Sequence, residues 1–219
     1  LTQVKKLPKV PWSNFDTGLC LQFPNQGQLH PLRYIAGLSQ AVLRAGGQIF
    51  KNAYVSEFQG GKQAYVKTQE GTKVNAAVLV IATNTPVNDK VMIHTKQVAY
   101  RSYVIGATIP KGTVPQALYW DTENPYHYVR LAPHPDKDKE MLVVGGEDHR
   151  TGEHKNISAL FTKLENWTKE RFPQIQSIAY RWSGQIMEPV DGLAFIGRNP
   201  GDYSNVYVAT GDSGHGMTH

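Results

Sequence analysis

Residues that could do chemistry gather in one short segment, Tyr126–Arg130. Alternate residues of an extended strand share a face, so Tyr126, Tyr128 and Arg130 would lie on the same side of a strand. A guanidinium group beside phenol hydroxyls can hold a carboxylate through charge-assisted hydrogen bonds. The segment therefore predicts a binding surface for a small carboxylate-bearing substrate. The alternative, aromatic residues packed in a core beside a solvated arginine, stays open because strand aromatics usually pack.

Histidine side chains are the candidates for moving protons, because an unperturbed imidazole titrates at about pH 6.5. His127 and His149 come first among them. The sequence does not assign the catalytic residue, and the candidates are His127, Tyr128 and Arg130. No spacing of His, Asp and Glu is typical of a metal site, and Glu147–His149 is too compact to form one. We therefore expect no metal ion.

A glycine-rich segment near the end of the sequence is the second chemical feature. It begins at Thr210 and contains Gly211, Gly214 and Gly216. Glycine lets a backbone turn tightly under a flat or anionic ligand. The apolar residues just before it, Asn205–Ala209, are expected to form a short buried parallel strand.

A second apolar run, Ala77–Ala82, also ends in Ala-Thr, at Thr83. Ligands of open α/β sheets bind beyond the carboxyl ends of parallel strands. The two strand ends together predict a ligand site, although each alone reads equally as an ordinary strand followed by a turn. We expect the two runs to be adjacent parallel strands.

The composition limits the class of protein to which these segments can belong. The 219 residues are 40% hydrophobic and 19% charged, which is typical of a globular chain. The formal net charge is +5, but the Lys and Arg residues are scattered, so we expect no nucleic-acid partner. Cys20 is the only cysteine, which excludes an internal disulfide and fits a reducing, cytoplasmic compartment. No apolar run reaches the roughly 18 residues of a membrane span.

Periodicity and turn residues predict two kinds of element. One part alternates helix and strand: a helix at 32–45, strands at 48–55 and 193–197, and a hairpin of 54–58 with 63–68. Between its parts lie β-rich segments that predict a separate, mainly antiparallel sheet, in which Tyr126–Ala132 pairs with Met141–Gly146. The segments are Val98–Ile109, Ala117–Trp120, His127–Ala132 and Met141–Gly146, followed by a helix at Ile157–Phe172, a strand at Ser177–Gly184 and a loop at Met187–Gly192.

This order of segments resembles the D-amino-acid oxidase/glycine oxidase superfamily of flavoproteins. Within it, the chain is most similar to bacterial FAD-dependent oxidoreductases that carry a C-terminal Rieske 2Fe–2S domain. The segments that carry the resemblance are His94–Gln97, Leu118–Thr122, Pro125–Arg130, Val144–His149, Arg181–Gln185, Glu188–Gly192 and Ala209–Gly214.

The resemblance implies an α/β (α+β) fold in two domains. Residues 1–94 and 177–219 would form a partial Rossmann-like FAD-binding domain, and residues 95–176 an inserted, mainly antiparallel substrate domain. It also implies oxidation of a small amine or amino-acid-like substrate by hydride transfer to flavin, with a Rieske domain in the parent chain as a possible partner. The implied FAD contacts are Val55 at the adenine, Ala82, Thr83 and Asn84 near the ADP moiety, and Gly211, Asp212, Ser213, Gly214, His215 and Gly216 beside the isoalloxazine ring.

The chain also departs from the family pattern. It contains no Gly-x-Gly-x-x-Gly turn, which holds the FAD pyrophosphate in the family. We therefore expect an internal-to-C-terminal portion of the parent enzyme, with weak or absent FAD binding and an open edge on the strand Ala77–Ala82. Ile186 stands five residues before Asp191-Gly192, where amino-acid oxidases commonly place an arginine, so a substrate other than an α-amino acid is expected. The alternative function is a non-catalytic scaffold or partner-docking module.

Overall fold

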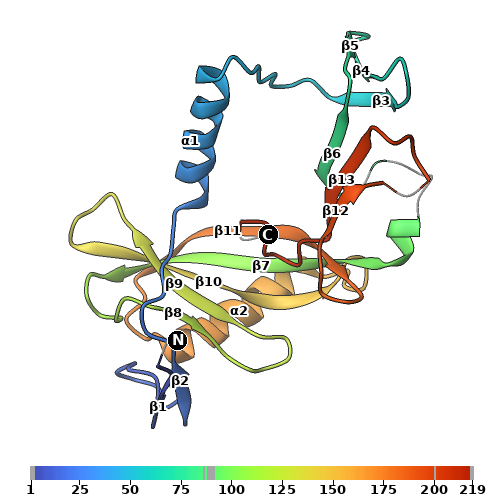
Figure 1. Cartoon of the computed structure of the whole chain (residues 1–219). Helices are drawn as coiled ribbons and strands as arrows, with labels where there is room; N and C mark the ends of the chain where they lie inside the picture. Colours follow the sequence, from blue (N-terminus) through green and yellow to red (C-terminus); the bar gives the residue numbers. More distant parts are fainter. Residues whose placement is uncertain (1–2, 86, 88–91, 200, 218–219) are drawn as a thin grey trace. The chain divides into compact units, whose positions relative to one another are not determined.

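The computed structural model describes residues 3–85, 87, 92–199 and 201–217. The chain divides into two compact units with three boundaries: one lies between Gln28 and Leu29, and the other two fall within the long strands β7 (Gln97–Pro110) and β11 (Ser177–Pro189). The first unit comprises Leu1–Gln28 and Tyr100–Gln185, and the second comprises Leu29–Ala99 and Ile186–His219. Each unit is described below by itself (Figure 1).

The first unit is built on a five-stranded sheet in the order β11-β7-β10-β9-β8. Strand β10 pairs antiparallel with β7 and with β9, and β8 pairs antiparallel with β9. The predicted antiparallel pairing of Tyr126–Ala132 with Met141–Gly146 is thereby confirmed. The bounds of the three remaining strands are β8 Leu118–Trp120, β9 Tyr128–Pro133 and β10 Lys139–Arg150.

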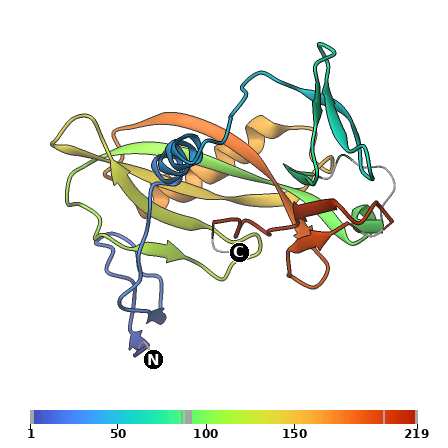
Figure 2. The same cartoon turned by 45° about the horizontal axis from the view of Figure 1, so that its top comes forward.

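Helix α2 (Ile157–Arg171) runs along one face of this sheet (Figures 1 and 2). Asn156 caps its first turn by accepting a hydrogen bond from the Ala159 amide at 3.1 Å. Pro173 follows the helix closely and cannot continue it. Leu164 and Thr168 are its buried positions and lie on the side that faces the sheet.

The core of the first unit lies between α2 and the sheet. Alternate residues of β7 and β10 supply one side of it, as the two-residue period of a strand requires. The residues of the sheet are Tyr103, Ile105, Ala107, Ile109, Val129, Leu131, Leu142 and Val144, which pack with Leu164 and Phe172. The opposite face of the same sheet carries a second, smaller apolar cluster of Val104, Met141 and Val143 with Tyr128 and Ala132 packed against it.

The beginning of the chain also belongs to the first unit. Strands β1 (Lys5–Leu7) and β2 (Cys20–Gln22) pair antiparallel. Between them, Trp12 packs edge-on against Phe172 at 4.6 Å and Tyr119 at 5.2 Å. These contacts explain why residues 1–28 cluster with the sheet that the sequence boundaries assigned to 95–176. Residues 177–185 join it as well, because β11 lies beside β7.

The second unit contains a three-stranded sheet in the order β12-β13-β6. Strands β13 and β6 are parallel, with Val206 opposite Leu79 and Val208 opposite Ile81, which confirms the predicted pair of parallel strands. Strand β6 stands at the end of this sheet, so its outer edge has no neighbouring strand among the described residues. The bounds are β6 Leu79–Asn84, β12 Phe195–Arg198 and β13 Val206–Thr210.

The remaining elements of the second unit are local. The predicted hairpin exists as β3 paired antiparallel with β4, and β4 pairs with β5. Helix α1 begins at the predicted Pro31, capped by His30, and buries none of its residues. The bounds are α1 Pro31–Arg44, β3 Val55–Gln59, β4 Tyr65–Thr68, β5 Lys73–Asn75 and a 3-10 helix η1 Met92–Thr95. No helix among the described residues is long and apolar enough to cross a membrane.

Two local predictions were wrong. Residues 48–54 do not form a strand, because Asn52 adopts a left-handed φ of 55° that interrupts extended backbone. Met187–Pro189 is not a loop but the end of β11, and the turn begins only at Val190, whose amide donates to the Lys96 carbonyl at 2.9 Å. Among the described residues, 48–54 belong to no sheet, whereas Met187–Pro189 extend β11, which lies beside β7.

Candidate functional site

The side chains of His127 and Tyr128 pack against two consecutive glycines of β10, Gly145 and Gly146. Tyr128 stands opposite Gly145 in the antiparallel register. A Cβ atom on Gly145 would lie 2.0 Å from Cζ of Tyr128, and one on Gly146 would lie 2.6 Å from Cδ2 of His127. The two rings therefore lie against consecutive glycines. Because consecutive residues of a strand point to opposite faces, Tyr128 and His127 occupy opposite sides of the sheet.

Tyr128 and Arg130 share the face opposite α2, which we call the Tyr128 face. Burial is the main cause that raises the pKa of the Tyr128 phenol; the Ser102 hydroxyl lowers it, the Asp148 carboxylate raises it and the Arg130 guanidinium lowers it. The phenol consequently keeps its proton at neutral pH and can donate a hydrogen bond. Tyr126 is close by, with its ring centroid 6.2 Å from that of Tyr128. The Tyr128 face thus presents a phenol donor, a cation and an anion together.

Asp148 reaches this face because β10 contains a bulge. Gly146 stands opposite Tyr103 and His149 opposite Arg101, so Glu147 and Asp148 together face the single residue Ser102. The first residue of the pair, Glu147, has a left-handed φ of 58°. An extra residue in one strand shifts the alternation of side chains. The Glu147 side chain therefore turns toward α2, and Asp148 turns toward Tyr128.

On the α2 side, His127 is the centre of a buried polar cluster, which we call the His127 network. Its Nδ1 lies 3.0 Å from Oδ2 of Asp121, and its Nε2 lies 3.2 Å from Oε1 of Glu147. The other oxygen of Glu147 accepts from Nζ of Lys163 at 2.7 Å. The imidazole stacks on Trp167 with ring centroids 4.3 Å apart. His127 and Glu147 are each 3% exposed.

His149 also lies on the α2 side. Its Nδ1 is 2.7 Å from the carbonyl oxygen of Arg150, and its Nε2 is 3.1 Å from the hydroxyl of Tyr103. A carbonyl only accepts, so Nδ1 carries the proton and Nε2 accepts from the phenol. Burial raises the pKa of Tyr103. His149 therefore has both ring nitrogens engaged inside the unit.

The structure thus divides the sequence candidates into two groups. Tyr128 and Arg130 share a face as predicted from their spacing, whereas His127 and His149 are on the opposite face and do not join them. Sequence reasoning missed Asp148 on the Tyr128 face and Glu147 in the His127 network. The signal for both was the pair Gly145-Gly146, since two glycines inside a strand often mark a bulge or a close approach of other atoms.

One set of side chains has the composition of a metal site. The ligand atoms of Asp121, Glu123 and His127 lie within 4.8 Å of one another. Their acceptors already have partners: Oδ1 of Asp121 accepts from the His127 amide at 2.7 Å, and Glu123 lies 3.4 Å from the Arg171 guanidinium. A nearby guanidinium disfavours a bound cation. This set therefore reads as a hydrogen-bonded cluster, and the absence of a metal stays a prediction.

In the second unit, all of the predicted cofactor residues except Val55 lie at or directly after the ends of the parallel strands β6 and β13. The Thr210 hydroxyl donates to the carbonyl oxygen of Asn84 and so ties the end of β13 to the end of β6. Asn84 has a left-handed φ of 62°, and the Thr83 hydroxyl donates to the Thr85 carbonyl at 2.7 Å. Ala82 and Thr83 are exposed. Val55 is exposed at the start of β3.

The segment after Thr210 turns tightly, as the glycines predicted. Gly211, Ser213 and Gly214 have left-handed φ values of 69°, 48° and 75°. The turn is held by the Ser213 amide donating to the Met187 carbonyl at 3.2 Å and by the Ser213 hydroxyl donating to Glu188. Backbone that alternates in this way can form a concave surface of N–H groups for an anion.

At Gly216 the same turn leaves no room for a side chain. A Cβ atom on Gly216 would lie 2.2 Å from Oδ2 of Asp212. His215 completes the turn by donating its amide to the Asp212 carbonyl at 2.7 Å.

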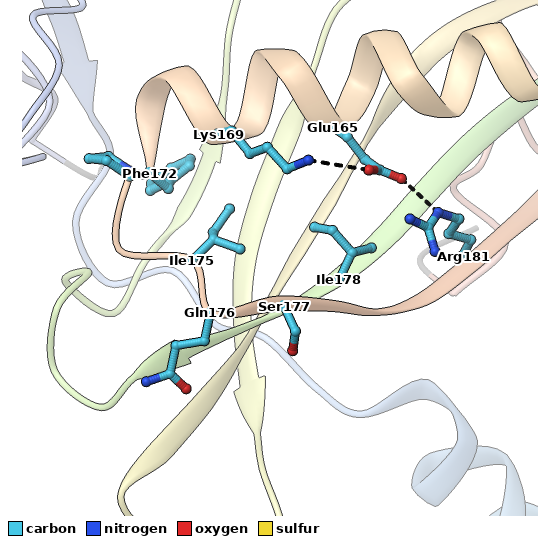
Figure 3. A pocket seen from close by; sticks show the side chains of 9 residues that line it. Glu165, Lys169, Phe172, Ile175, Gln176, Ser177, Ile178 and Arg181 are labelled. Carbon is cyan, nitrogen blue, oxygen red and sulfur yellow. Dashed lines mark hydrogen bonds and ion pairs between the residues drawn. The ribbon is translucent and has the colours of Figure 1, made fainter.

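A separate groove of about 500 Å³ lies between the second half of α2 and the start of β11 (Figure 3). Glu165 lies between its two cations, with Oε1 2.6 Å from Nε of Arg181 and Oε2 3.6 Å from Nζ of Lys169. The groove shares no residue with the Tyr128 face or with the His127 network. It is therefore not the substrate surface that the sequence predicts.

Comparison with known proteins identifies the family to which the chain belongs. The sequence matches the family described as DAO, FAD dependent oxidoreductase, over residues 2–219. It is 28% identical over 98% of the chain to the Bacillus subtilis (strain 168) protein YhfW, which carries the name of a Rieske 2Fe-2S iron-sulfur protein. It is 26% identical over 88% of the chain to the gamma-glutamylputrescine oxidoreductase of Escherichia coli (strain K12).

The fold is similar to that of a solved glycine oxidase from Bacillus cereus ATCC 14579. The TM-score is 0.71 at 15% identity, over 91% of this chain and 55% of the glycine oxidase chain. The chain spans 41% of YhfW and 45% of the gamma-glutamylputrescine oxidoreductase. It thus covers less than half the length of these two relatives.

Proposed function

Because the chain belongs to the DAO family of FAD-dependent oxidoreductases, we propose that it is the part of such an enzyme that carries the binding surface for a small amine or amino-acid-like substrate and contributes residues to the flavin site. The observation that carries this proposal is the Tyr128 face. There a protonated phenol shares one side of a sheet with the Arg130 guanidinium and the Asp148 carboxylate. These groups complement a molecule that has both an anionic and a cationic end.

The flavin would be held by the strand ends and the turn of the second unit. The residues are Val55, Ala82, Thr83, Asn84, Gly211, Asp212, Ser213, Gly214, His215 and Gly216. When bound, FAD supplies the hydride acceptor for oxidation of the carbon next to the substrate nitrogen. Backbone N–H groups of the turn at Gly211–Gly216 would stabilise negative charge at the edge of the ring. The electron acceptor beyond the flavin would be a Rieske domain in the parent chain, as the name of YhfW suggests.

Each residue of the Tyr128 face has its own task in this proposal. Arg130 binds a carboxylate, since a guanidinium presents several donors in a planar fork. Tyr128 donates its hydroxyl hydrogen to the same anion, because its raised pKa keeps that hydrogen in place. Asp148 accepts from the substrate amine and orients the carbon that is oxidised. Ile186 leaves the usual arginine position without a cation, so the carboxylate need not be attached to the oxidised carbon.

The relatives support an amine substrate in which the two charged ends are separated. Gamma-glutamylputrescine, named in one of them, carries an amine at one end and an amino-acid group at the other. Glycine, named in a protein of similar fold, carries both groups on one carbon. The departure at Ile186 favours the former arrangement. We therefore propose an ω-amine with a distant carboxylate as the substrate class.

The test is anaerobic reduction of the flavin in the complete parent protein. A panel of amines with and without a carboxylate is added, and loss of the flavin absorbance band near ~450 nm is followed. We expect bleaching by carboxylate-bearing amines. Arg130→Gln should raise KM for these by about 10- to 100-fold, in line with the loss of one or two charge-assisted hydrogen bonds. Amines without a carboxylate should be oxidised equally by both proteins.

Two results would contradict the proposal. Complete parent protein that binds no flavin would remove the oxidoreductase function. An Arg130→Gln effect of equal size on both groups of amines would remove the substrate surface while leaving the oxidoreductase function standing.

A further inference from the structure

The left-handed backbone of Glu147 needs a physical cause. A side chain with a Cβ rarely adopts a φ of 58°, and such a conformation persists only where the surroundings hold it. Glycine would adopt it freely. The chain nevertheless places a glutamate there and buries its side chain to 2% exposure. The contacts of the Glu147 carboxylate must therefore hold the bulge.

Two side chains, Lys163 and His127, contact that carboxylate, and they differ in how firmly each is held. Lys163 contacts Oε2 at 2.7 Å, but its side chain is 63% exposed and its ammonium can bond to water instead. His127 contacts Oε1 at 3.2 Å with a side chain that is only 4% exposed. Its ring is confined between Gly146 and Trp167, which leaves it no alternative position. His127 is thus the partner that fixes Glu147.

A second carboxylate fixes His127 in turn. Asp121 accepts from the His127 amide at 2.7 Å through Oδ1 and contacts Nδ1 at 3.0 Å through Oδ2. Nδ1 and Nε2 of His127 therefore each lie within hydrogen-bond distance of a different carboxylate, and the ring is held from both ends. The charged groups that face the ring are Asp121 and Glu123 before β9, Glu147 on β10, and Lys163 and Arg171 on α2.

The consequence appears on the other side of the sheet. Without the bulge, side chains of β10 beyond Gly146 would alternate in the opposite sense, and Asp148 would leave the Tyr128 face. We propose that His127 is a positioning residue, which holds Glu147 in its left-handed conformation and thereby keeps Asp148 on the Tyr128 face. Its effect on amine oxidation rests on the function proposed above, but its effect on the sheet does not.

The experiment reads Tyr128 directly and needs neither flavin nor substrate. The full chain is labelled with 3-fluorotyrosine at position 128, and the titration of that phenol is followed by 19F NMR. The variant His127→Phe keeps a flat ring on Trp167 and over Gly146 but cannot donate. We expect its Tyr128 titration midpoint to shift down, because the Asp148 carboxylate, which raises the pKa of Tyr128, moves away.

A second change separates positioning from mere loss of stability. Glycine favours a positive φ, so His127→Phe combined with Glu147→Gly should keep the bulge and return the midpoint toward that of the wild type. Leu164→Ala is the matched control: it opens the core on the same face but removes none of the polar contacts of the His127 network, and should lower Tm without moving the midpoint. The milder Asp121→Asn should shift the midpoint in the same direction as His127→Phe, but less.

Two results would overturn the proposal. One is a wild-type midpoint in folded His127→Phe protein. The other is a double variant whose midpoint stays as low as that of the single variant. The proposed function can fail while this result holds, since bleaching of flavin and titration of Tyr128 are measured separately.

Discussion

The contact between Tyr128 and Gly145 allows a quantitative test of the site. In Gly145→Ala, the new methyl group would lie 2.0 Å from Cζ and 2.2 Å from Oη of Tyr128. Carbon atoms in contact are normally about 3.5–4.0 Å apart, so the ring must leave its place. Overpacking of this kind costs about 1–3 kcal/mol of the free energy of unfolding. The backbones of Tyr128 and Gly145 are paired across β9 and β10, which limits how far either backbone can move to relieve the clash.

The clash depends entirely on the Tyr128 ring, and a double-mutant cycle isolates it. In a Tyr128→Ala background the same Gly145→Ala change removes a flexible glycine from a strand, which should stabilise the first unit by about 0.5–1 kcal/mol. The sign of the effect should therefore reverse between the two backgrounds. The coupling energy should be about 1.5–4 kcal/mol.

Urea unfolding followed by tryptophan fluorescence is the assay. All four tryptophans, Trp12, Trp120, Trp167 and Trp182, lie in the first unit, so the signal reports on that unit. Gly184→Ala is the matched control, because a Cβ atom there would meet nothing within 4 Å. It should change the free energy of unfolding by less than about 1 kcal/mol. Equal costs of Gly145→Ala in the two backgrounds would refute the placement of the Tyr128 ring.

Three further predictions concern the second unit and the ionisation of Tyr128. Thr210→Val removes the hydroxyl that donates to the Asn84 carbonyl and should lower the free energy of unfolding by about 1–3 kcal/mol. Thr210→Ser keeps the donor and should lower the free energy of unfolding clearly less. Equal losses in the two variants would argue against this hydrogen bond. Titration of the isolated chain with FAD should show little quenching of flavin fluorescence, because the sequence has no Gly-x-Gly-x-x-Gly turn, and tight stoichiometric quenching would contradict this. The contribution of Tyr128 to the free energy of unfolding should be constant below the ordinary tyrosine pKa of 10.0 and fall as the pH rises above it, because the unfolded chain loses the Tyr128 proton first. Tyr128→Phe should therefore reduce the fall in stability at high pH, and an unchanged slope would show that Tyr128 does not contribute to it.

The sequence predicted most elements because their signals are local. Helix α2 was predicted from an apolar stripe followed by Pro173, and α1 from Pro31 and the glycines after it. The parallel strands β6 and β13 were predicted because both are short apolar runs that end in Ala-Thr. The two wrong predictions concern segments whose structure depends on pairing with another strand. Residues 48–54 have β propensity but pair with no strand among the described residues, and Met187–Pro189 lies in a strand despite its turn-like composition.

The composition of the candidate site was visible in the sequence, but the grouping of its residues was not. A two-residue period placed Tyr126, Tyr128 and Arg130 on one face, and it separated His127 from them by the same rule. Only the tertiary structure decided which face α2 covers, and therefore that His127 is buried among carboxylates while Tyr128 stands beside Asp148. The reason is that the bulge at Glu147 reverses the alternation of β10, and the contact with His127, 20 residues away in the chain, holds that bulge.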